Sequence, residues 1–434
     1  MSDSKRPLAS RPMSRRDFIR LGMAFSLAVP SISALAGCTA GAPAPTATPA
    51  KRKLAMAFDA VQFWDDQAKE FSQKTGIEFK YEQIPFPQLH DKYLASFMSG
   101  GKEYDVVHVR DDYVAEWAPK GFLEALDSRV TDAMKNEHTP GAFNYLSNKG
   151  KIYGVPRYLW LWQFYYNTEL FEKAGLKDPP KTWAEFREYA KKLTKPPVYG
   201  AIFTYGANMP VNVFTMRIRA EGGEFMKDGM PTFNSPEGVT ALTDLVNMVK
   251  DGSVDPSSFE LTTTGTMTDI FTQGRAAMTV STPPTLSMAA DPAKSQVVGK
   301  VQVALIPGSK LKSGGYSELG GVAITSTSAD KDAAWEFVKF VTSAEQQKKM
   351  ALAIGRIPTL PSLLNDPEVQ KKYSAAAIAA EQMKYPAGMA IVVPQQAEIN
   401  TAVGNELAAA LRGQKPVEQA LADAEKATLK ILGK

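Results

Sequence analysis

An α/β fold in two lobes is predicted from the alternation of strand and helix patterns and from the length of the chain. Strand-like and helix-like segments follow one another throughout, which is typical of α/β architecture. The chain has 434 residues, and the roughly 380 that we expect to fold exceed one comfortable hydrophobic core. With 44% hydrophobic and 22% charged residues, the composition is that of an ordinary globular protein.

The first half of the predicted first lobe alternates strand, helix, strand, helix and strand. Apolar runs and period-2 alternation predict the strands, and amphipathic stretches that end at glycine predict the helices. The expected strands are residues 53–58, 77–83 and 104–109, and the expected helices are residues 64–74 and 88–98. This order predicts a largely parallel sheet.

Helix starts further along the chain have a readable capping pattern. Thr182 and Glu185 have the spacing of a capping box, and Ser343 with Gln346 has the same spacing. Ser235 precedes a proline, as an N-cap before a first-turn proline does. The apolar stripe that follows is closed by Gly252 and predicts a packed helix face.

The N-terminal residues 1–38 have the pattern of an export signal. Arg15 and Arg16 form a twin-arginine pair, residues 21–36 are uncharged and mostly apolar, and the LAGC sequence that ends at Cys38 resembles a lipobox, in which the cysteine is lipidated. The alternative is an uncleaved membrane anchor with a chance cysteine. Residues 39–51 are rich in Pro, Ala and Thr and predict a flexible linker.

Charge and cysteine content exclude several classes of function. The formal net charge is +4, but residues 1–38 carry six basic and two acidic residues. The remainder holds 44 of the 50 basic and 44 of the 46 acidic side chains, so it has no excess positive charge to attract nucleic acid. Cys38 is the single cysteine, which excludes a disulfide within the chain and any cysteine-based metal site in the folded part.

Several motifs in a fixed order resemble one family. These are YDVV at 104–107, GFLEAL at 121–126, GKIYGVP at 150–156, YYN at 165–167, PPKTW at 179–183, GRAAM at 274–278 and GGVAI at 320–324. Together they are similar to extracellular solute-binding proteins of family 1, the maltose-binding type, over residues 52–430. The resemblance implies a periplasmic-binding-protein-like fold with hinge crossings and an inter-lobe ligand cleft. It also implies a lipid-anchored, extracytoplasmic monomer that captures a sugar by hinge closure and delivers it to an ABC permease.

The hinge crossings that the resemblance implies lie near residues 158–162, 318–322 and 361–367. They divide the folded part into lobe one, residues 52–158 and 322–362, and lobe two, residues 159–321 and 363–434. In open α/β sheets, ligands bind at loops beyond the carboxyl ends of the strands. We therefore expect the ligand contacts in loops of this kind, on both sides of the crossings.

Aromatic and polar side chains near the crossings are candidates for holding a sugar, since aromatic rings cover sugar faces and polar groups bond the hydroxyls. The resemblance implies contacts from Trp160, where a compared relative has an acidic residue, and from Asp112. Position after a strand suggests Asp59 and Gln83, and Arg110 and Arg157 can donate forked hydrogen bonds. The remaining candidates are Trp162, Asn212, Tyr316 and Tyr385, the last as an aromatic lid.

The sequence also departs from the maltose-binding pattern. Residues 282–284 (TPP) stand where maltose-type relatives carry a stacking tryptophan, which argues against a maltodextrin ligand. A polyamine, an oxyanion, ferric ion or another small solute is the alternative within the binding class. An exported carbohydrate-active hydrolase and a ligand-free adhesion protein are the alternatives outside it.

Enzymatic chemistry has little support in the sequence. The patterns H-E-x-x-H, G-x-S-x-G and the P-loop are absent, and His90, His108 and His138 are scattered without metal-ligand spacing. Asp111 and Asp112 are adjacent, so their side chains diverge and make a poor catalytic dyad. We expect no catalytic residue, no metal and no cofactor.

Overall fold

The structure is a computed structural model that describes residues 52–58, 63–139, 141–206, 209–388 and 391–434. Contacts divide the chain after Ala50, and every described residue belongs to the unit Lys51–Lys434. Within the described residues, no helix combines the length and the apolar character that a membrane span requires.

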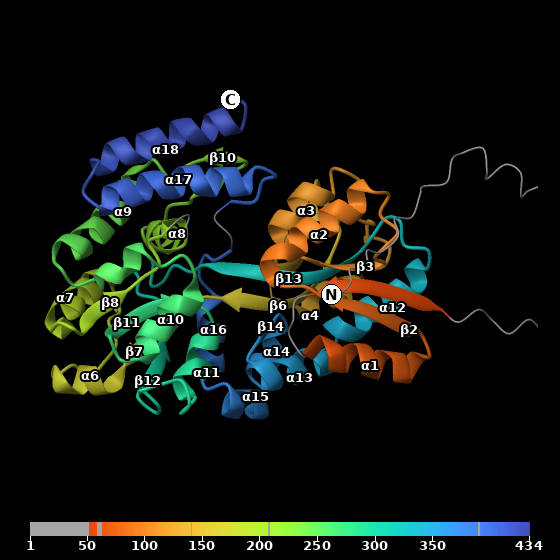
Figure 1. Cartoon of the computed structure of the whole chain (residues 1–434), viewed down its shortest axis with the longest axis horizontal. Coiled ribbons are helices and arrows are strands. Elements are labelled where there is room, and N and C mark those ends of the chain that lie inside the picture. The colour runs from red at the N-terminus through yellow and green to blue at the C-terminus, as the bar shows by residue number, and fades with distance from the viewer. Residues whose placement is uncertain (1–51, 59–62, 140, 207–208, 389–390) are drawn as a thin grey trace, which may run out of the picture. The chain divides into compact units, whose positions relative to one another are not determined.

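The predicted alternation at the start of this unit is present (Figure 1). Strand β1 (Lys53–Phe58) pairs in parallel with β2 (Glu78–Gln83), and helix α1 (Phe63–Thr75) connects them. Helix α2 (Phe86–Met98) then leads to β3 (Val106–Val109). The amide of Asp105 donates to the carbonyl of Ala55 at 2.8 Å, which holds the start of β3 against β1.

The prediction of a largely parallel sheet is wrong for the strands around β3. A four-stranded sheet has the order β14-β6-β13-β3, and each of its pairings is antiparallel. Its new members are β6 (Val155–Leu161), β13 (Ser317–Ile324) and β14 (Ile357–Pro358). An antiparallel partner needs no crossover helix, so β13 can join this sheet on its return from a distant part of the chain. Local patterns along the first hundred folded residues contain no sign of that return.

A second sheet follows directly. It has the order β12-β7-β11-β8, with β11 parallel to β8 and antiparallel to β7. The strands are β7 (Gln163–Asn167), β8 (Tyr199–Ile202), β11 (Ala276–Ser281) and β12 (Val301–Ala304). Only Trp162 separates β6 from β7, so the chain passes there from the first sheet to the second. Two sheets with separate cores give the two-lobed α/β fold that the sequence predicted.

Helices and short hairpins complete both lobes (Figure 1). Phe71 of α1 and Phe337 of α12 (Lys331–Thr342) lie in one core of the first lobe. Phe214 of α8 (Pro210–Ala220) and Leu407 of α17 (Gln396–Leu411) lie in the core of the second. The other elements are α3 (Asp111–Trp117), α4 (Asp132–Glu137), α5 (Ala142–Tyr145), β4 (Ser147–Asn148), β5 (Lys151–Ile152), α6 (Thr168–Lys173), α7 (Trp183–Leu193), β9 (Met226–Lys227), β10 (Met230–Pro231), α9 (Pro236–Lys250), a 3₁₀ helix (Pro256–Phe259), α10 (Thr264–Thr272), α11 (Pro284–Ala290), α13 (Ala344–Ile354), α14 (Pro361–Leu364), α15 (Pro367–Lys372), α16 (Ala376–Gln382) and α18 (Val417–Ile431).

Two of the three predicted caps are confirmed, and the third is confirmed only for the Ser343 hydroxyl. Thr182 and Glu185 form a complete capping box, and Ser235 caps α9. The Ser343 hydroxyl accepts from the Gln346 amide at 3.3 Å, but Gln346 does not reciprocate. Its side chain bonds α1 instead, accepting from Gln67 and donating to Glu70 at 3.0 Å each. The prediction of a box there was wrong because a tertiary contact takes the side chain that would complete it.

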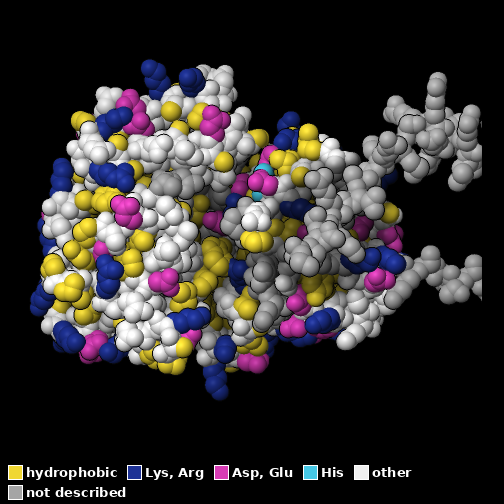
Figure 2. Space-filling model, viewed as in Figure 1, with side chains coloured by type: hydrophobic (Ala, Val, Ile, Leu, Met, Phe, Trp, Pro, Cys, Tyr) yellow, Lys and Arg dark blue, Asp and Glu magenta, His cyan; other side chains and the backbone are white. Residues whose placement is uncertain are grey.

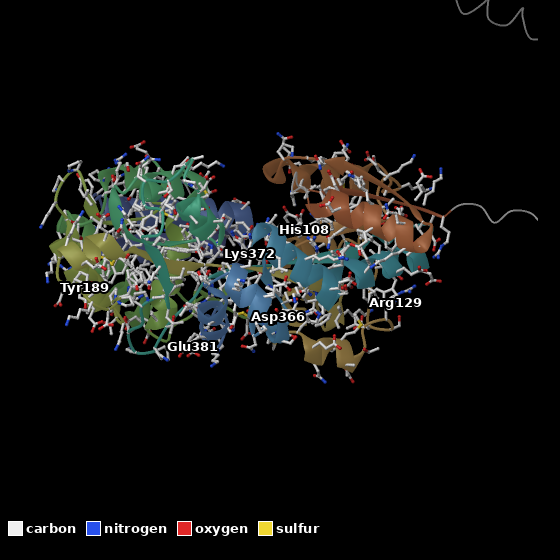
Figure 3. The ribbon with its side chains drawn as sticks, turned by 90° about the horizontal axis from the view of Figure 1, so that it is seen from below. His108, Arg129, Tyr189, Asp366, Lys372 and Glu381 are labelled. Atoms are coloured by element: carbon white, nitrogen blue, oxygen red, sulfur yellow. The ribbon has the colours of Figure 1, made fainter. Side chains whose placement is uncertain are left out.

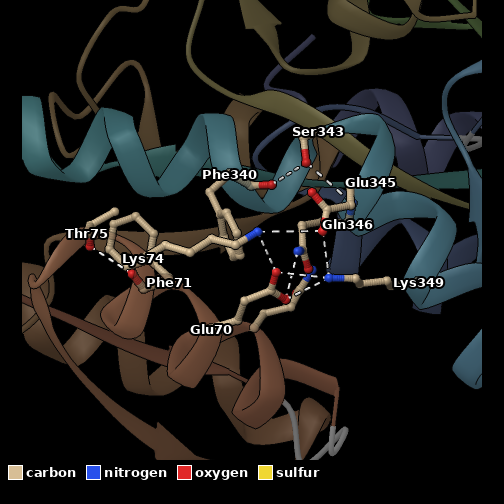
Figure 4. A network of polar contacts seen from close by, with 10 residues as sticks. Glu70, Phe71, Lys74, Thr75, Phe340, Ser343, Glu345, Gln346 and Lys349 are labelled. Atoms are coloured by element: carbon tan, nitrogen blue, oxygen red, sulfur yellow. Dashed lines mark hydrogen bonds and ion pairs between the residues drawn. The ribbon is translucent and has the colours of Figure 1, made fainter.

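The same contact extends into a network of charges between α1 and α13 (Figure 4). Glu70 accepts from Lys74 at 2.7 Å and from Lys349 at 2.9 Å. Burial acts to raise the pKa of Glu70, but the bonds from Lys74 and Lys349 outweigh it and lower the pKa to about 2. The network fixes α13, whose far end lies beside the candidate site.

Candidate functional site

A forked ion pair lies where β3 ends and α3 begins. The Arg110 guanidinium donates to both Asp112 carboxylate oxygens, through Nε at 3.0 Å and Nη2 at 2.5 Å. Its Nη1 donates to Glu318 of β13 at 3.1 Å. The side chains of Arg110 and Asp112 are 17% and 9% exposed, so little water competes for these bonds. One planar cation therefore holds two carboxylates from distant parts of the sequence.

Burial shifts the pKa values of several groups in and beside this ion pair. Burial acts to lower the pKa of Arg110, but Asp112 and Glu318 outweigh it and hold that pKa well above the ordinary value. Burial also raises the pKa of the Glu318 carboxyl, although Arg110 opposes the rise. The adjacent Asp111 is 1% exposed, and neither of its oxygens has a hydrogen-bond partner among the described residues. Burial, reinforced by Asp112, raises the pKa of Asp111 well above its usual range, so this carboxyl favours the protonated form.

Aromatic rings adjoin the ion pair. Trp160 lies opposite Glu318 in the β6–β13 ladder. The Arg356 guanidinium carbon lies 4.0 Å from the centroid of the Trp160 ring and 4.8 Å from that of Tyr158, which are cation–π distances. We call Arg110, Asp112, Tyr158, Trp160, Glu318 and Arg356 the β3–β6 cluster. It combines fixed donors and acceptors with two aromatic surfaces.

The side chain of Arg157, in β6, contacts helix α1. Its guanidinium lies 3.5 Å from the Trp64 ring centroid and donates to Gln67 at 2.5 Å, both on α1. Besides burial, the charge of Arg157 also lowers the pKa of His108, whose ring stacks on that of Tyr158 with the two centroids 6.0 Å apart. Burial, followed by the charges of Arg110, Arg157 and Arg356, lowers the pKa of His108 to about 3. His108 is therefore neutral beside the cluster.

Two further predicted residues pack against each other at the crossing between the sheets. Trp162 and Tyr316 are 3% and 5% exposed, and their rings meet edge to face at 5.7 Å. The Trp162 amide donates to the Tyr316 carbonyl at 3.0 Å. This is the geometry of core packing, and the ligand contacts expected from both residues stay a prediction.

The other predicted residues are dispersed. Gln83 is exposed and donates to Asp65 at 2.9 Å, Asn212 is half-buried in the first turn of α8, and the Tyr385 hydroxyl donates to Glu381 at 3.1 Å. The described contacts join none of these three to the β3–β6 cluster. The remaining predictions, Asp59, Cys38, Arg15 and Arg16, lie outside the described residues.

Glu318 and Arg356 belong to the cluster but were not predicted as site residues. Glu318 directly precedes the Leu319-Gly320-Gly321 segment, and it was noted only as the start of a hinge crossing. Arg356 lies between α13 and β14, a segment with no aromatic or acidic pattern around it. Only the pairing of β6 with β13 and β14 brings both beside Trp160.

A pocket of about 540 Å³ lies beside the cluster. Residues of α11 and β12, from the second lobe, form one wall, and the end of α13 forms the other together with the last residue of α15 and the two residues after it. Figure 3 shows Lys372, one of the lining residues, in the middle of the view, with Asp366 of the same region near it. The surface around these elements mixes basic, acidic and hydrophobic side chains without a single-sign patch on the visible face (Figure 2).

Two lobes that share crossing strands, with a desolvated polar and aromatic cluster at the crossings, define a binding protein for a small solute. The model of the bacterial extracellular solute-binding protein family matches residues 59–348. The chain belongs to this family.

Individual relatives extend the similarity to most of the chain. A Sinorhizobium fredii protein named "Probable amino-acid ABC transporter periplasmic-binding protein" is 27% identical and aligns over 86% of each chain. The mannitol-binding protein of Pseudomonas aeruginosa is 26% identical over 81% of this chain and 86% of its own. The solved structure of maltose-bound MalE3 from T. maritima is 26% identical with a TM-score of 0.77, covering 88% of this chain and 99% of that one. The family and these relatives are binding proteins.

Proposed function

We propose that the protein is the substrate-binding lipoprotein of an ABC importer and that it captures a sugar, mono- or oligosaccharide, at the β3–β6 cluster. The observation that carries the proposal is the Arg110–Asp112–Glu318 fork beside Trp160 and Tyr158. Sugars present hydroxyls at the rim and C–H groups on the faces. Fixed carboxylates and guanidinium groups bond the hydroxyls, and aromatic rings cover the C–H faces.

The relatives support a sugar or polyol over other solutes. One is named for mannitol and the solved structure holds maltose, while a third is named for amino acids. The carboxyls of Asp111 and Glu318 favour a second candidate, a polyamine, because burial disfavours the charge of both and a cationic ligand would restore it. We propose no catalytic role for any of these residues.

Delivery and anchoring complete the proposal. Lipidation of Cys38 after export through the Arg15-Arg16 signal would anchor a monomer outside the cytoplasmic membrane, and residues 39–51 would tether it. The lobes, residues 52–158 with 322–362 and residues 159–321 with 363–434, would close about the three crossings and present the loaded protein to the permease. Loss of radiolabelled acyl chain from a Cys38→Ala variant tests the anchor separately.

A thermal-shift screen of residues 52–434 against sugars, polyols, polyamines and oxyanions tests the choice of solute. A ligand at 100 times its Kd adds about 2.7 kcal/mol, a rise in Tm of about 3 °C for a chain of this size. We expect a saturable shift with one group of sugars, abolished by Trp160→Ala or Asp112→Ala. Arg187→Met, which breaks an exposed pair with Asp251, is the matched control and should leave the shift intact. A shift with polyamines alone would refute the sugar.

A further inference from the structure

The 540 Å³ pocket is large enough to hold part of a ligand. Its volume lies within the range of small-molecule binding pockets, about 300–1,000 Å³. None of the residues predicted from the sequence lines it. The pocket is lined by α11 of the second lobe and by α13 of the first, so a ligand there contacts both lobes.

The lining has the mixed chemistry that suits a carbohydrate. Leu286, Ile354 and the ring of Tyr373 supply apolar surface for sugar faces. Ser287, Asp291 and Lys372 supply a hydroxyl, a carboxylate and an ammonium group for the hydroxyls of the rim. The Tyr373 hydroxyl is already bonded to Gln163 of β7, which fixes the ring in the wall.

The pocket adjoins the β3–β6 cluster along residues 354–356. Ile354 lines the pocket and also packs against the small core formed by Tyr158 and Met350, which Trp160 adjoins as well. Gly355 lines the pocket as well, and the next residue, Arg356, covers the Trp160 ring. A solute bound at Trp160 and extended past Ile354 therefore enters the pocket.

We propose that this pocket is a second sugar subsite, and that the solute is an oligosaccharide with one unit at the β3–β6 cluster and the next between α11 and α13. The inference rests on the proposed function and decides between the single-unit and multi-unit sugars that it leaves open. A single sugar ring at the cluster leaves the pocket to water, whereas a longer chain gains a second set of contacts.

Filling the pocket from either wall tests the proposal. Ala353 of α13 and Ala290 of α11 line the pocket and are exposed, so Ala353→Trp and Ala290→Trp place an indole in it without disturbing a core. Ala344→Trp, at the exposed start of α13 and outside the pocket, is the matched control. Isothermal titration of the purified proteins would use glucose, xylose and galactose, each with its di- and trisaccharides.

We expect the wild-type protein and Ala344→Trp to bind one di- or trisaccharide at least about tenfold more tightly than its monosaccharide. Both pocket variants should lose that advantage and keep the affinity for the monosaccharide. Equal wild-type affinity along the series, or an equal loss for all lengths, would overturn the second subsite and leave sugar binding standing. Absence of binding by any sugar to the wild-type protein would overturn the proposed function, and the subsite with it.

Discussion

Arg110→Met should destabilise the protein by removing the one cation that bonds two buried carboxylates. Asp112 and Glu318, 9% and 23% exposed, would be left without that partner in a site with little water. Removing one partner of a buried pair costs about 3–5 kcal/mol, and the partial exposure of Glu318 places this case near about 3 kcal/mol. The unfolding entropy of a chain of about 380 residues is about 0.8 kcal/mol per kelvin, which converts the loss to about 4 °C in Tm.

The effect should also depend on pH in a defined direction. Burial already raises the pKa of Glu318 in the presence of Arg110, and loss of Arg110 raises it further. A raised pKa in the folded state means that stability is kept at low pH and lost as pH rises. The difference between Arg110→Met and wild type should therefore be largest at pH 7 and shrink toward pH 5.

Calorimetry at pH 7 and pH 5 measures both effects. Arg187→Met is the control, because Arg187 and Asp251 form a more exposed pair that should contribute about 0.5 kcal/mol or less. Equal Tm values for Arg110→Met and Arg187→Met at pH 7, or a gap that widens toward pH 5, would refute the account of Arg110 as the buried counter-ion.

Three further changes test neighbouring features. Arg356→Met should lower the free energy of unfolding by about 1 kcal/mol and alter the fluorescence of Trp160, whose ring loses its cation; unchanged emission would contradict the contact. Gly320→Ala should cost about 1–3 kcal/mol in urea unfolding, since its Cβ would lie 2.3 Å from Cζ of Tyr158, and Tyr158→Ala in the same chain should recover part of it. Burial lowers the pKa of His138 to about 4, so its neutral form stabilises the fold above the unfolded pKa of about 6.5 and this contribution is lost as pH falls to 4; His138→Gln should flatten the stability profile in that window, and a parallel profile would exclude the role.

The sequence predicted what local patterns control. The strand at residues 53–58, the helix that follows it and the cap at Thr182 depend on neighbours within a few residues, and each is present. The antiparallel sheet was missed because β13 joins β3 and β6 from more than 150 residues away. The prediction of a capping role for Gln346 was wrong for the same reason, since its side chain bonds residues of α1 that are distant in the sequence.

The residues of the candidate site differ in the same way, because some stand in recognisable local patterns and others do not. Arg110, Asp112 and Trp160 stand in recognisable segments after a strand or within an aromatic run, and the structure brings them together. Glu318 and Arg356 complete the cluster from segments without such a pattern. Trp162 and Tyr316 were predicted from the same aromatic and loop signals, and their rings lie edge to face. An aromatic run does not reveal which rings face a partner ring, and the ligand contacts expected from both residues stay a prediction.

The pairing of β13 with β3 and β6 has a consequence for biosynthesis. Arg110 and Glu318 are 208 residues apart, and the ribosome adds about 5–20 residues per second, so the first lobe waits on the order of 10–40 s for its central strand. The second sheet, contained between β7 and β12, emerges whole during that wait. Nascent chains halted before residue 317 contain every strand of the second sheet but neither β13 nor α17, whose Leu407 lies in the core of the second lobe. Both lobes therefore depend on residues that are synthesised late, and neither should resist protease before those residues emerge.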